Sequence, residues 1–423
     1  MTFRRTDILL PKFSGDSEKM KKWSVVACDQ YTSEPEYWKA VSDFTMDSET
    51  TLNLTVPEIY LADNDIEDRI KKTNAKMQDY MADDVFAEYK NTYIFVERTL
   101  KCGSVRLGIV GMVDLEDYDY TKDSRTKIRA TEGTVLSRIP PRLKVRCDAP
   151  IELPHIMMLI DDDKCDIIES NAKIKESFEK LYDFDLMQDS GHITGYKMSD
   201  EACDALDKKL AALSDLDSFN MKYGVSEVSP LVYAMGDGNH SLATAKAHYE
   251  NLKTEIGEEK AKNSPARYAL CELVNLHDKS LVFEAIHRVV FDADGKAFLE
   301  ALEKQYCVSY DENAEGQSFV FVLGGESKKV TVTNPKEYLT VATVQKALDA
   351  FVSENGGEID YIHGEDVVNK HCADNKNFGI IFDAMDKSDL YKSVILDGAL
   401  PRKTFSMGEA CDKRFYTECR KIK

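Results

Sequence analysis

The sequence of 423 residues lacks the short motifs that mark the commonest phosphate-binding and hydrolytic sites. It has no GxxxxGKS or GxxxxGKT loop, no GxGxxG turn, no HRD or DFG set and no GxSxG elbow. These absences exclude a P-loop, a Rossmann dinucleotide site, a protein-kinase site and an α/β-hydrolase site. A phosphate site in this chain therefore requires a different scaffold.

Long apolar runs and paired cysteines are also missing. No segment is apolar over the length of a membrane span, and Met1–Phe13 carries charges without the apolar core of a secretory signal. The ten cysteines are scattered, with no CxxC pair or other spacing that would indicate zinc. Reduced thiols account for them, so we expect a cytoplasmic protein with no membrane partner.

Positive charge is in the minority, with 55 Lys and Arg against 75 Asp and Glu and a formal net charge of -20. This balance opposes nonspecific attraction to nucleic acid, so we expect no nucleic-acid partner. Segment 122–146 is a local exception and is either an anion site or a solvated basic loop. Its basic residues are Lys122, Arg125, Lys127, Arg129, Arg138, Arg142, Lys144 and Arg146.

Short apolar runs alternate with helical periodicity, and the hydrophobic content of 43% is enough for a large core. This alternation predicts an α+β fold. The expected strands are 23–28, 93–96, 105–113, 156–160, 231–235, 268–276, 281–290, 319–323 and 329–332, with 268–276 and 281–290 forming a pair. The expected helices are 66–90, 168–184, 242–252, 296–305, 341–352 and 388–396.

The composition shifts near Asp292-Ala293-Asp294-Gly295, where a smaller α/β region begins. We therefore expect a core with insertions over residues 1–290 and a C-terminal α/β region over residues 291–423. No low-complexity linker separates the two regions, so the second is expected to pack on the first.

The stretch richest in chemistry is Leu231–Ser241, where an apolar strand meets the turn Gly-Asp-Gly-Asn-His-Ser and then a helical pattern. Asn239 or Ser241 is expected to cap the helix. A helix N-terminus has unsatisfied N–H donors and partial positive charge, so it favours an anion, most commonly phosphate. Asp237 is a Mg²⁺ ligand, a general base or only an Asx-turn residue. His240 donates to a phosphoryl oxygen, acts in acid–base chemistry or is structural.

A second group of polar residues occupies positions 129–134. There, Arg129 and Glu132 stand close to two threonine hydroxyls. The group supplies a proton acceptor with an anion clamp, or it is simply a turn with a helix cap.

Two further groups are unusual for their surroundings. His287 and Arg288 are neighbours within the apolar run 283–290, so we expect them on opposite faces, with one reaching the site. The three aspartates at 161–163 follow a strand and either bind a divalent metal or form a solvated turn.

In their order along the chain, several of these segments resemble the bacterial family with the domain of unknown function 1015, of the ParB/sulfiredoxin-like superfamily. The matching segments are 27–29, 131–134, 235–241, 286–288 and 400–408. In the family the turn reads Asp-Gly-His-His-Arg, whereas here Asn239 replaces the first histidine and Ser241 replaces the arginine. The resemblance spans nearly the whole chain and implies a ParB/sulfiredoxin-like mixed-sheet core with large insertions.

The superfamily includes free-serine kinases, which fit an acidic protein that binds no nucleic acid. The resemblance therefore implies phosphorylation of free L-serine, with Mg²⁺ and with pyrophosphate, ADP or ATP as co-substrate. In that function Glu132 or Asp237 accepts the hydroxyl proton, His240 is a third catalytic residue, and Asp237 holds the metal. The implied substrate and phosphate-binding residues are Asp29, Arg129, Thr134, Arg138, Gly236, Gly238, Asn239, Ser241, His287 and Arg288.

Other functions remain open from the sequence alone. The same turn would serve a nucleotide-binding regulatory protein that binds its ligand with negligible turnover. Sulfiredoxin-like thiol chemistry needs a cysteine beside the turn, and none lies within 230–245, although Cys28 is next to Asp29. A structural protein with a chance glycine turn is the remaining alternative. The oligomeric state does not follow from the sequence.

Overall fold

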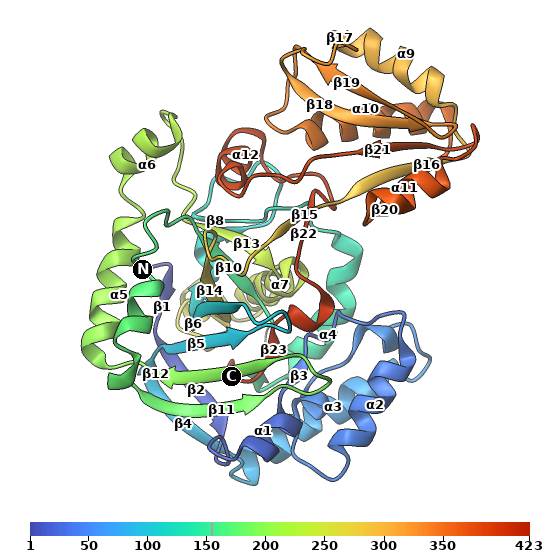
Figure 1. Cartoon of the computed structure of the whole chain (residues 1–423). Helices are drawn as coiled ribbons and strands as arrows, with labels where there is room; N and C mark the ends of the chain where they lie inside the picture. The colour runs from blue at the N-terminus through green and yellow to red at the C-terminus, as the bar shows by residue number, and fades with distance from the viewer. Residues whose placement is uncertain (154) are drawn as a thin grey trace. The chain divides into compact units, whose positions relative to one another are not determined.

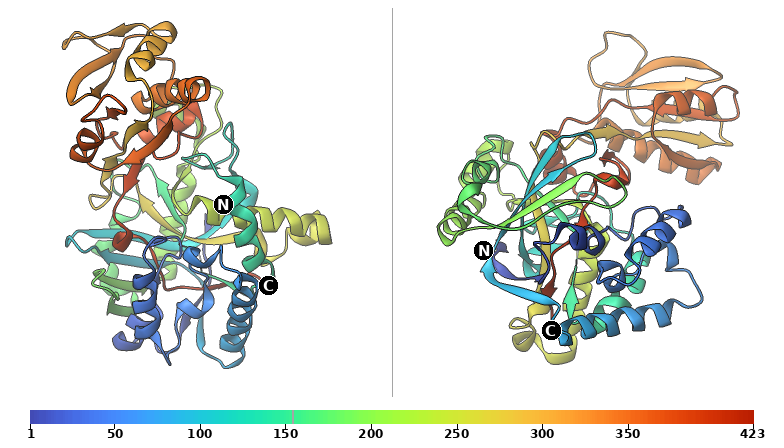
Figure 2. Two further views of the ribbon diagram at one scale, coloured as in Figure 1. Left: turned by 90° about the vertical axis from the view of Figure 1, so that its right-hand side faces the viewer. Right: turned by 60° about the horizontal axis from the view of Figure 1, so that its bottom comes forward.

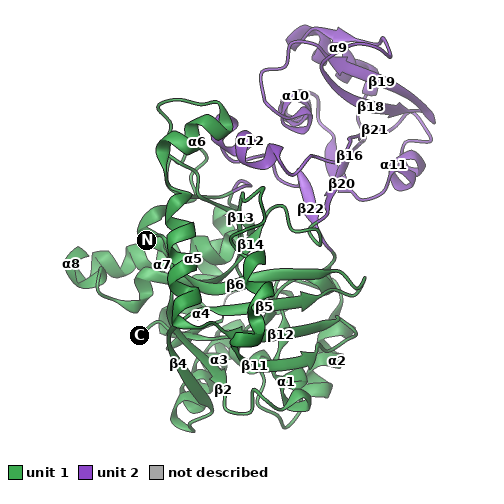
Figure 3. Ribbon diagram, turned by 60° about the vertical axis from the view of Figure 1, so that its left-hand side comes forward, with its two compact units in different colours: residues 1–130, 134–281, 409–423 green, residues 131–133, 282–408 purple. Residues whose placement is uncertain are grey.

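The computed structural model describes residues 1–153 and 155–423, which form two compact units. Unit 1 comprises residues 1–130, 134–281 and 409–423, and unit 2 comprises residues 131–133 and 282–408 (Figure 3). The chain thus changes unit after Leu281, and its last segment returns to unit 1. The expected domain boundary after residue 290 stays a prediction.

A ten-stranded mixed sheet forms the centre of unit 1 (Figure 1). Its order is β11, β12, β5, β6, β14, β10, β13, β8 and β7, and β1 pairs with β6. β10 is parallel to β14, and β8 is parallel to β13 and β7, whereas the other neighbours are antiparallel. The bounds are β1 (Phe3–Arg4), β5 (Ile94–Thr99), β6 (Val105–Asp114), β7 (Tyr118–Asp119), β8 (Ile128–Arg129), β10 (Met157–Ile160), β11 (Glu179–Asp185), β12 (His192–Lys197), β13 (Tyr233–Asp237) and β14 (Tyr268–Asn275).

Both faces of this sheet are buried. On β5, Ile94 packs into one core cluster and its neighbour Phe95 into another, because successive side chains of a strand point to opposite faces. On β6, Val110 and Ile109 divide in the same way. The sheet is therefore covered on each side, and side chains that carry chemistry gather where its strands end.

Helices and small sheets surround the large sheet of unit 1. The helices are α1 (Ser17–Trp23), α2 (Pro35–Thr45), α3 (Ile66–Ala82), α4 (Ile139–Asp148), α5 (Asp200–Ala212), α6 (Leu216–Tyr223), α7 (Asn239–Ile256) and α8 (Glu258–Ala261). Three strand pairs complete the unit: β2 (Thr6–Pro11) with β4 (Phe86–Thr92), β3 (Val25–Val26) with β23 (Phe415–Tyr416), and β9 (Ile151–Glu152) with β24 (Arg420–Lys421). Leu9 and Cys419 also form a β-bridge, so segments from the two ends of the chain lie side by side (Figure 2).

Unit 2 contains a six-stranded antiparallel sheet in the order β17, β19, β18, β21, β16 and β20. A separate strand pair joins β15 to β22. The strands are β15 (Phe283–Ala285), β16 (His287–Phe291), β17 (Val308–Ser309), β18 (Gln317–Leu323), β19 (Glu326–Val332), β20 (Glu358–Ile362), β21 (Phe378–Ile381) and β22 (Phe405–Met407). The helices are α9 (Gly295–Gln305), α10 (Thr340–Asn355), α11 (Glu365–His371) and α12 (Asp389–Asp397).

The predicted α+β fold, with a mixed-sheet core and a smaller C-terminal α/β region, is confirmed. The expected helix at 66–90 is wrong in its last part, because α3 ends at Ala82 and Phe86–Thr92 form β4, which pairs with β2. The expected helix at 168–184 is wrong, because this segment forms two short 3-10 turns and then β11, whose pairing with β12 overrides its helix-like spacing. The expected pair of 268–276 with 281–290 is also wrong. β14 pairs with β6 and β10, whereas β15 and β16 belong to unit 2, because a fully buried strand carries no sequence signal for its neighbour.

Among the described residues, no helix combines the length and the apolar character that a bilayer crossing requires.

Candidate active site

The turn after β13 leads directly into α7, as the sequence predicts. Gly238 adopts a left-handed conformation with φ of 80° and stands at the N-cap position, and the helix begins at Asn239. The expectation that Asn239 or Ser241 caps α7 is therefore wrong, because both lie inside its first turn. No side chain of the described residues caps this end, so the N–H groups of the first turn lack intrahelical acceptors.

Both glycines of the turn lie close to β10 and to Ile156, the residue before it. A Cβ at Gly238 would lie 3.0 Å from the Cα of Ile156, and its φ also disfavours other residues. A Cβ at Gly236 would lie 3.0 Å from Leu159 Cγ and 3.2 Å from the carbonyl oxygen of Met157. The turn is thus a close-packed piece of backbone rather than a loose loop.

The carboxylate of Asp237 has two kinds of partner. Its Oδ1 accepts a hydrogen bond of 2.8 Å from the N–H of Gly238, which stabilises the bend. Its Oδ2 lies 3.3 Å from Nζ of Lys413, which the C-terminal segment brings back to unit 1. One oxygen therefore shapes the turn, while the other faces a cation.

His240 is neutral at physiological pH. Burial and the nearby cations Arg142 and Arg138 lower the pKa of His240 to about 4. Its Nε2 accepts a hydrogen bond of 3.3 Å from the N–H of Val135, so the ring proton is assigned to Nδ1. The side chain is therefore a hydrogen-bond donor in the first turn of α7.

A row of three side chains lies next to this turn, in which His155 and Tyr416 are buried and Asp29 is half-buried. Nε2 of His155 is 3.3 Å from Oδ2 of Asp29, and Nδ1 of His155 is 2.9 Å from the hydroxyl of Tyr416. The Tyr416 hydroxyl also accepts a hydrogen bond of 3.0 Å from the N–H of Cys28. The row thus joins Asp29 to residues from two distant parts of the sequence.

Burial and nearby charge shift the pKa values of Asp29 and His155 in opposite directions. Burial opposes ionisation of Asp29, but the adjacent His155 outweighs it and holds the pKa of the carboxyl below its usual range. Burial likewise opposes protonation of His155, yet the Asp29 carboxylate, helped by Asp237, raises the pKa of the imidazole above its ordinary value. An ion pair between Asp29 and His155 is the result.

Two arginines add positive charge near the start of α7. Arg142 on α4 forms an ion pair with Glu58, and its Nη1 donates a hydrogen bond of 2.6 Å to the carbonyl oxygen of Arg138. Arg138 itself is exposed at the start of α4. Both guanidinium groups lower the pKa of His240, so their positive charge is felt at the start of α7.

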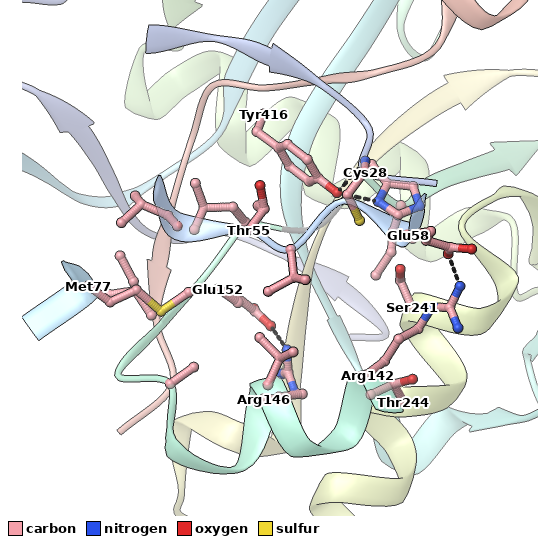
Figure 4. A pocket seen from close by; sticks show the side chains of 18 of the residues that line it. Cys28, Thr55, Glu58, Met77, Arg142, Arg146, Glu152, Ser241, Thr244 and Tyr416 are labelled. Atoms are coloured by element: carbon pink, nitrogen blue, oxygen red, sulfur yellow. Dashed lines mark hydrogen bonds and ion pairs between the residues drawn. The ribbon is translucent and has the colours of Figure 1, made fainter. Parts of the chain in front are cut away.

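A cavity of about 140 Å³ opens beside the turn, and we call it the central cavity (Figure 4). Ser241 and Thr244 of α7, together with Cys28, line one part of it. Arg146 and Glu152, paired at 2.6 Å, lie in another part. Five further polar or aromatic residues line it: Thr55, Glu58, Arg142, His155 and Tyr416. The remaining wall is apolar and comes from Leu54, Val56, Leu61, Met77, Val145, Ala149, Ile151, Leu153 and Ile156.

Two of the predicted phosphate-binding residues carry a buried oxygen without a partner. Within the described part of the chain, neither Thr134 Oγ1 nor Asn239 Oδ1 has a hydrogen-bond partner. Such atoms are costly to bury unless a ligand or water completes them. Arg129 is different, because its guanidinium donates to the carbonyl oxygens of Thr126 and Ser229, at 2.9 and 2.6 Å.

The structure brings Asp29, Arg138, Asp237 and His240 together with the rest of the turn. Arg129 and Thr134 also belong to unit 1, whereas Glu132, His287 and Arg288 belong to unit 2. There, Glu132 forms a β-bridge with Leu400.

His287 and Arg288 both have partners inside unit 2. Nδ1 of His287 accepts a hydrogen bond of 3.3 Å from the N–H of Phe382. Arg288 is fully buried, and its Nε donates to Gln345 Oε1 at 2.8 Å. The expectation that one of the two reaches the site stays a prediction.

The aspartates at 161–163 are engaged with protein groups. Asp161 accepts hydrogen bonds from Tyr223 and pairs with His277, at 2.6 and 2.7 Å. Asp162 accepts from the N–H groups of Asp166 and Ile167. In the described ranges no group of three or more His, Cys, Asp or Glu residues is arranged to hold a metal ion.

Sequence reasoning missed His155, Lys413 and Tyr416. Arg142 stands in the basic segment 122–146 that the sequence singles out, but no local pattern marks the other three. Lys413 and Tyr416 reach the site only because β23 pairs with β3, nearly four hundred residues away in the chain.

The family model described as "Protein of unknown function (DUF1015)" matches residues 10–351. No curated protein matches the chain. Among solved structures, a free serine kinase in complex with AMP is 12% identical, with a TM-score of 0.39, over 74% of this chain and 90% of that one. A conserved hypothetical protein from Pyrococcus furiosus is also 12% identical, with a TM-score of 0.36, over 74% and 94%. SbnI from Staphylococcus aureus, with a C-terminal truncation, is 8% identical, with a TM-score of 0.37, over 73% and 85%.

Proposed function

The chain belongs to the DUF1015 family, and we propose that it is a small-molecule kinase that transfers a phosphoryl group to the hydroxyl of free L-serine. The single observation that carries this proposal is the uncapped N-terminus of α7, with Arg138, Arg142 and Lys413 around it. Free N–H donors, a positive helix end and basic side chains together suit a phosphoryl group.

The turn is proposed to hold the phosphoryl group that is transferred. The backbone N–H groups of Asn239, His240 and Ser241 supply donors, and the neutral His240 adds its Nδ1–H. Arg138 and Lys413 are proposed to offset the charge that develops on the phosphoryl oxygens. Ser241 adds a hydroxyl at the wall of the central cavity.

The acidic and amide oxygens near the turn suit an amino acid as the molecule that receives the phosphoryl group. The ionised carboxylate of Asp29 and the unpartnered Oδ1 of Asn239 are acceptors for an ammonium group. In the transfer, the serine oxygen bonds to phosphorus as the bond to the leaving phosphate or nucleotide breaks. The hydroxyl proton passes to a carboxylate, for which Asp237 and Glu132 are the proposed candidates.

Mg²⁺ is proposed to bind together with the donor. Magnesium commonly uses one or two protein carboxylates plus substrate phosphates, and Asp237 Oδ2 is the proposed protein ligand. The bound ion would neutralise phosphate charge. Pyrophosphate is the proposed donor, because the sequence has no recognised nucleotide motif, and ADP and ATP are the alternatives.

The test is to incubate the purified chain with L-serine, Mg²⁺ and either pyrophosphate, ADP or ATP, and to measure O-phosphoserine. We expect product with at least one donor. A reaction that forms no product with any donor contradicts the kinase proposal. Donor binding without turnover supports instead the alternative of a nucleotide-binding regulatory protein.

Two carboxylate variants then assign the base. We expect Asp237→Asn or Glu132→Gln to lower kcat by about 10²- to 10⁴-fold, the usual contribution of a positioned base. Asp163→Asn changes an exposed aspartate outside the site and is the matched control. Full turnover in both Asp237→Asn and Glu132→Gln shows that the base lies elsewhere.

A further inference from the structure

A second cavity of about 290 Å³ lies between α2 and α3 in unit 1, and we call it the basic cavity. Trp38 of α2 and Tyr60 are the aromatic residues that line it. Arg69, Lys72 and Lys76 of α3 supply its charge. None of the residues that line it in the described chain is acidic, although the whole protein carries a net charge of -20.

The three cations share one side of α3. Their spacing of three and then four residues places them on adjacent turns of the same helix face. Arg69 is paired with Asp65 at 2.9 Å and lies 4.4 Å from the centre of the Tyr60 ring. Lys76 has a longer contact of 3.6 Å with Asp79. In the chain as described, Lys72 has no acidic partner, so its charge is available to a ligand.

Trp38 provides a second, independent sign of a ligand. Only 2% of its surface is exposed, and its Nε1–H has no acceptor among the described residues. A buried indole N–H usually has a hydrogen-bond partner. Trp38 lines the basic cavity, so an acceptor on a bound ligand that reaches Nε1 would supply the missing partner.

From these observations we infer that the basic cavity binds a small phosphate-bearing molecule. Phosphate oxygens accept hydrogen bonds from indole, guanidinium and ammonium groups alike, and a multiply charged anion matches a cavity without carboxylates. A nucleic acid fits less well, because the net charge of -20 opposes a long polyanion. The proposal does not depend on the kinase function.

The basic cavity is separate from the α7 turn but shares a wall with the central cavity. Thr55 and Val56 line both. A ligand in the basic cavity therefore contacts the segment that borders the proposed reaction site. The two sites can nevertheless be tested separately, because none of the three cations of α3 lines the central cavity.

The test is calorimetric titration of the full chain with inorganic pyrophosphate, and then with inorganic phosphate. We expect Lys72→Gln to weaken one binding event by about tenfold, the loss of one charge-assisted contact. Trp38→Phe should weaken the same event by about threefold to tenfold. Lys71→Gln is the matched control, since Lys71 is exposed on the same helix but does not line the cavity.

A third variant separates this site from the α7 turn. Arg138→Gln removes a cation near His240. The binding event that Lys72→Gln weakens should persist in the Arg138→Gln protein. The inference is overturned if no event responds to Lys72→Gln, or if Lys71→Gln weakens binding equally. It is also overturned if all pyrophosphate binding disappears in Arg138→Gln, because the anion then binds only at the turn.

Discussion

The α7 turn and the C-terminal segment Glu409–Lys423 contribute to one site in contrasting ways. The turn offers its backbone and side chains from a run of six residues, Gly236–Ser241. The C-terminal segment supplies Lys413 to Asp237 and Tyr416 to His155, across long stretches of chain. The comparison shows that a local motif supplies the donors, whereas long-range packing supplies the groups that set charge around them.

The C-terminal segment is held by buried ion pairs, and breaking one should have the largest effect. Arg414 donates to Glu272 at 2.9 Å and to Glu418 at 2.7 Å, and it is 5% exposed. Arg414→Met leaves two buried carboxylates without their cation, so we expect a loss of about 3–5 kcal/mol in the free energy of unfolding. Urea unfolding measures it.

Lys421→Met is the control for that change. Lys421 pairs with Glu88 at 2.9 Å on the surface, and an exposed pair is worth at most about 1 kcal/mol. Equal losses in the two variants would show that the buried network does not hold the segment.

The turn is tested by its second glycine. Gly238→Ala forces a left-handed φ on alanine and brings its Cβ to 3.0 Å from Ile156 Cα, so we expect a loss of about 2 kcal/mol. Gly133→Ala serves as the control, because nothing lies within 4 Å of its added Cβ. A Gly238→Ala protein as stable as wild type would mean that the turn is not conformationally constrained.

Tyr416→Phe is expected to have a smaller effect. Removing the hydroxyl leaves the N–H of Cys28 and Nδ1 of His155 without that partner, at a cost of about 1–2 kcal/mol. Tyr310→Phe removes an exposed hydroxyl bonded to Glu303 and should cost far less. Thermal unfolding compares the two variants. A similarly small change in both would show that the Tyr416 hydroxyl does not stabilise the row of Asp29, His155 and Tyr416.

The last expected effect is a dependence of stability on pH. The pKa of His240 is about 4 in the folded protein, against about 6.5 in an unfolded chain. Between these values the unfolded chain binds the extra proton, so this stabilisation is present above pH 6.5 and is lost as the pH falls toward 4. His240→Gln should therefore flatten the decline of Tm between pH 6.5 and 4.

The exposed His363 provides the comparison for this slope. His363→Gln should leave the decline of Tm unchanged. A His240→Gln protein with the wild-type slope would contradict the assignment of a neutral, half-buried imidazole.

The same contrast explains how much the sequence predicts. The strand, turn and helix around Asp237 follow from local pattern, because glycine placement and apolar spacing are written in neighbouring residues. The cap was mispredicted, since Gly238 takes the position expected for Asn239 or Ser241. Lys413 and Tyr416 could not be predicted, because their places depend on the pairing of β23 with β3.

The fold shows the same limit. The α+β class and most elements of unit 2 follow from periodicity. The partners of β11 and β14 do not, because buried strands present similar apolar runs to any neighbour.

The most direct test of the central claim is a crystal structure of the chain with bound pyrophosphate. We expect phosphate oxygens within hydrogen-bond distance of the backbone N–H groups of Asn239, His240 or Ser241. Pyrophosphate bound elsewhere, with nothing at the start of α7, would contradict the claim that this turn holds the phosphoryl group.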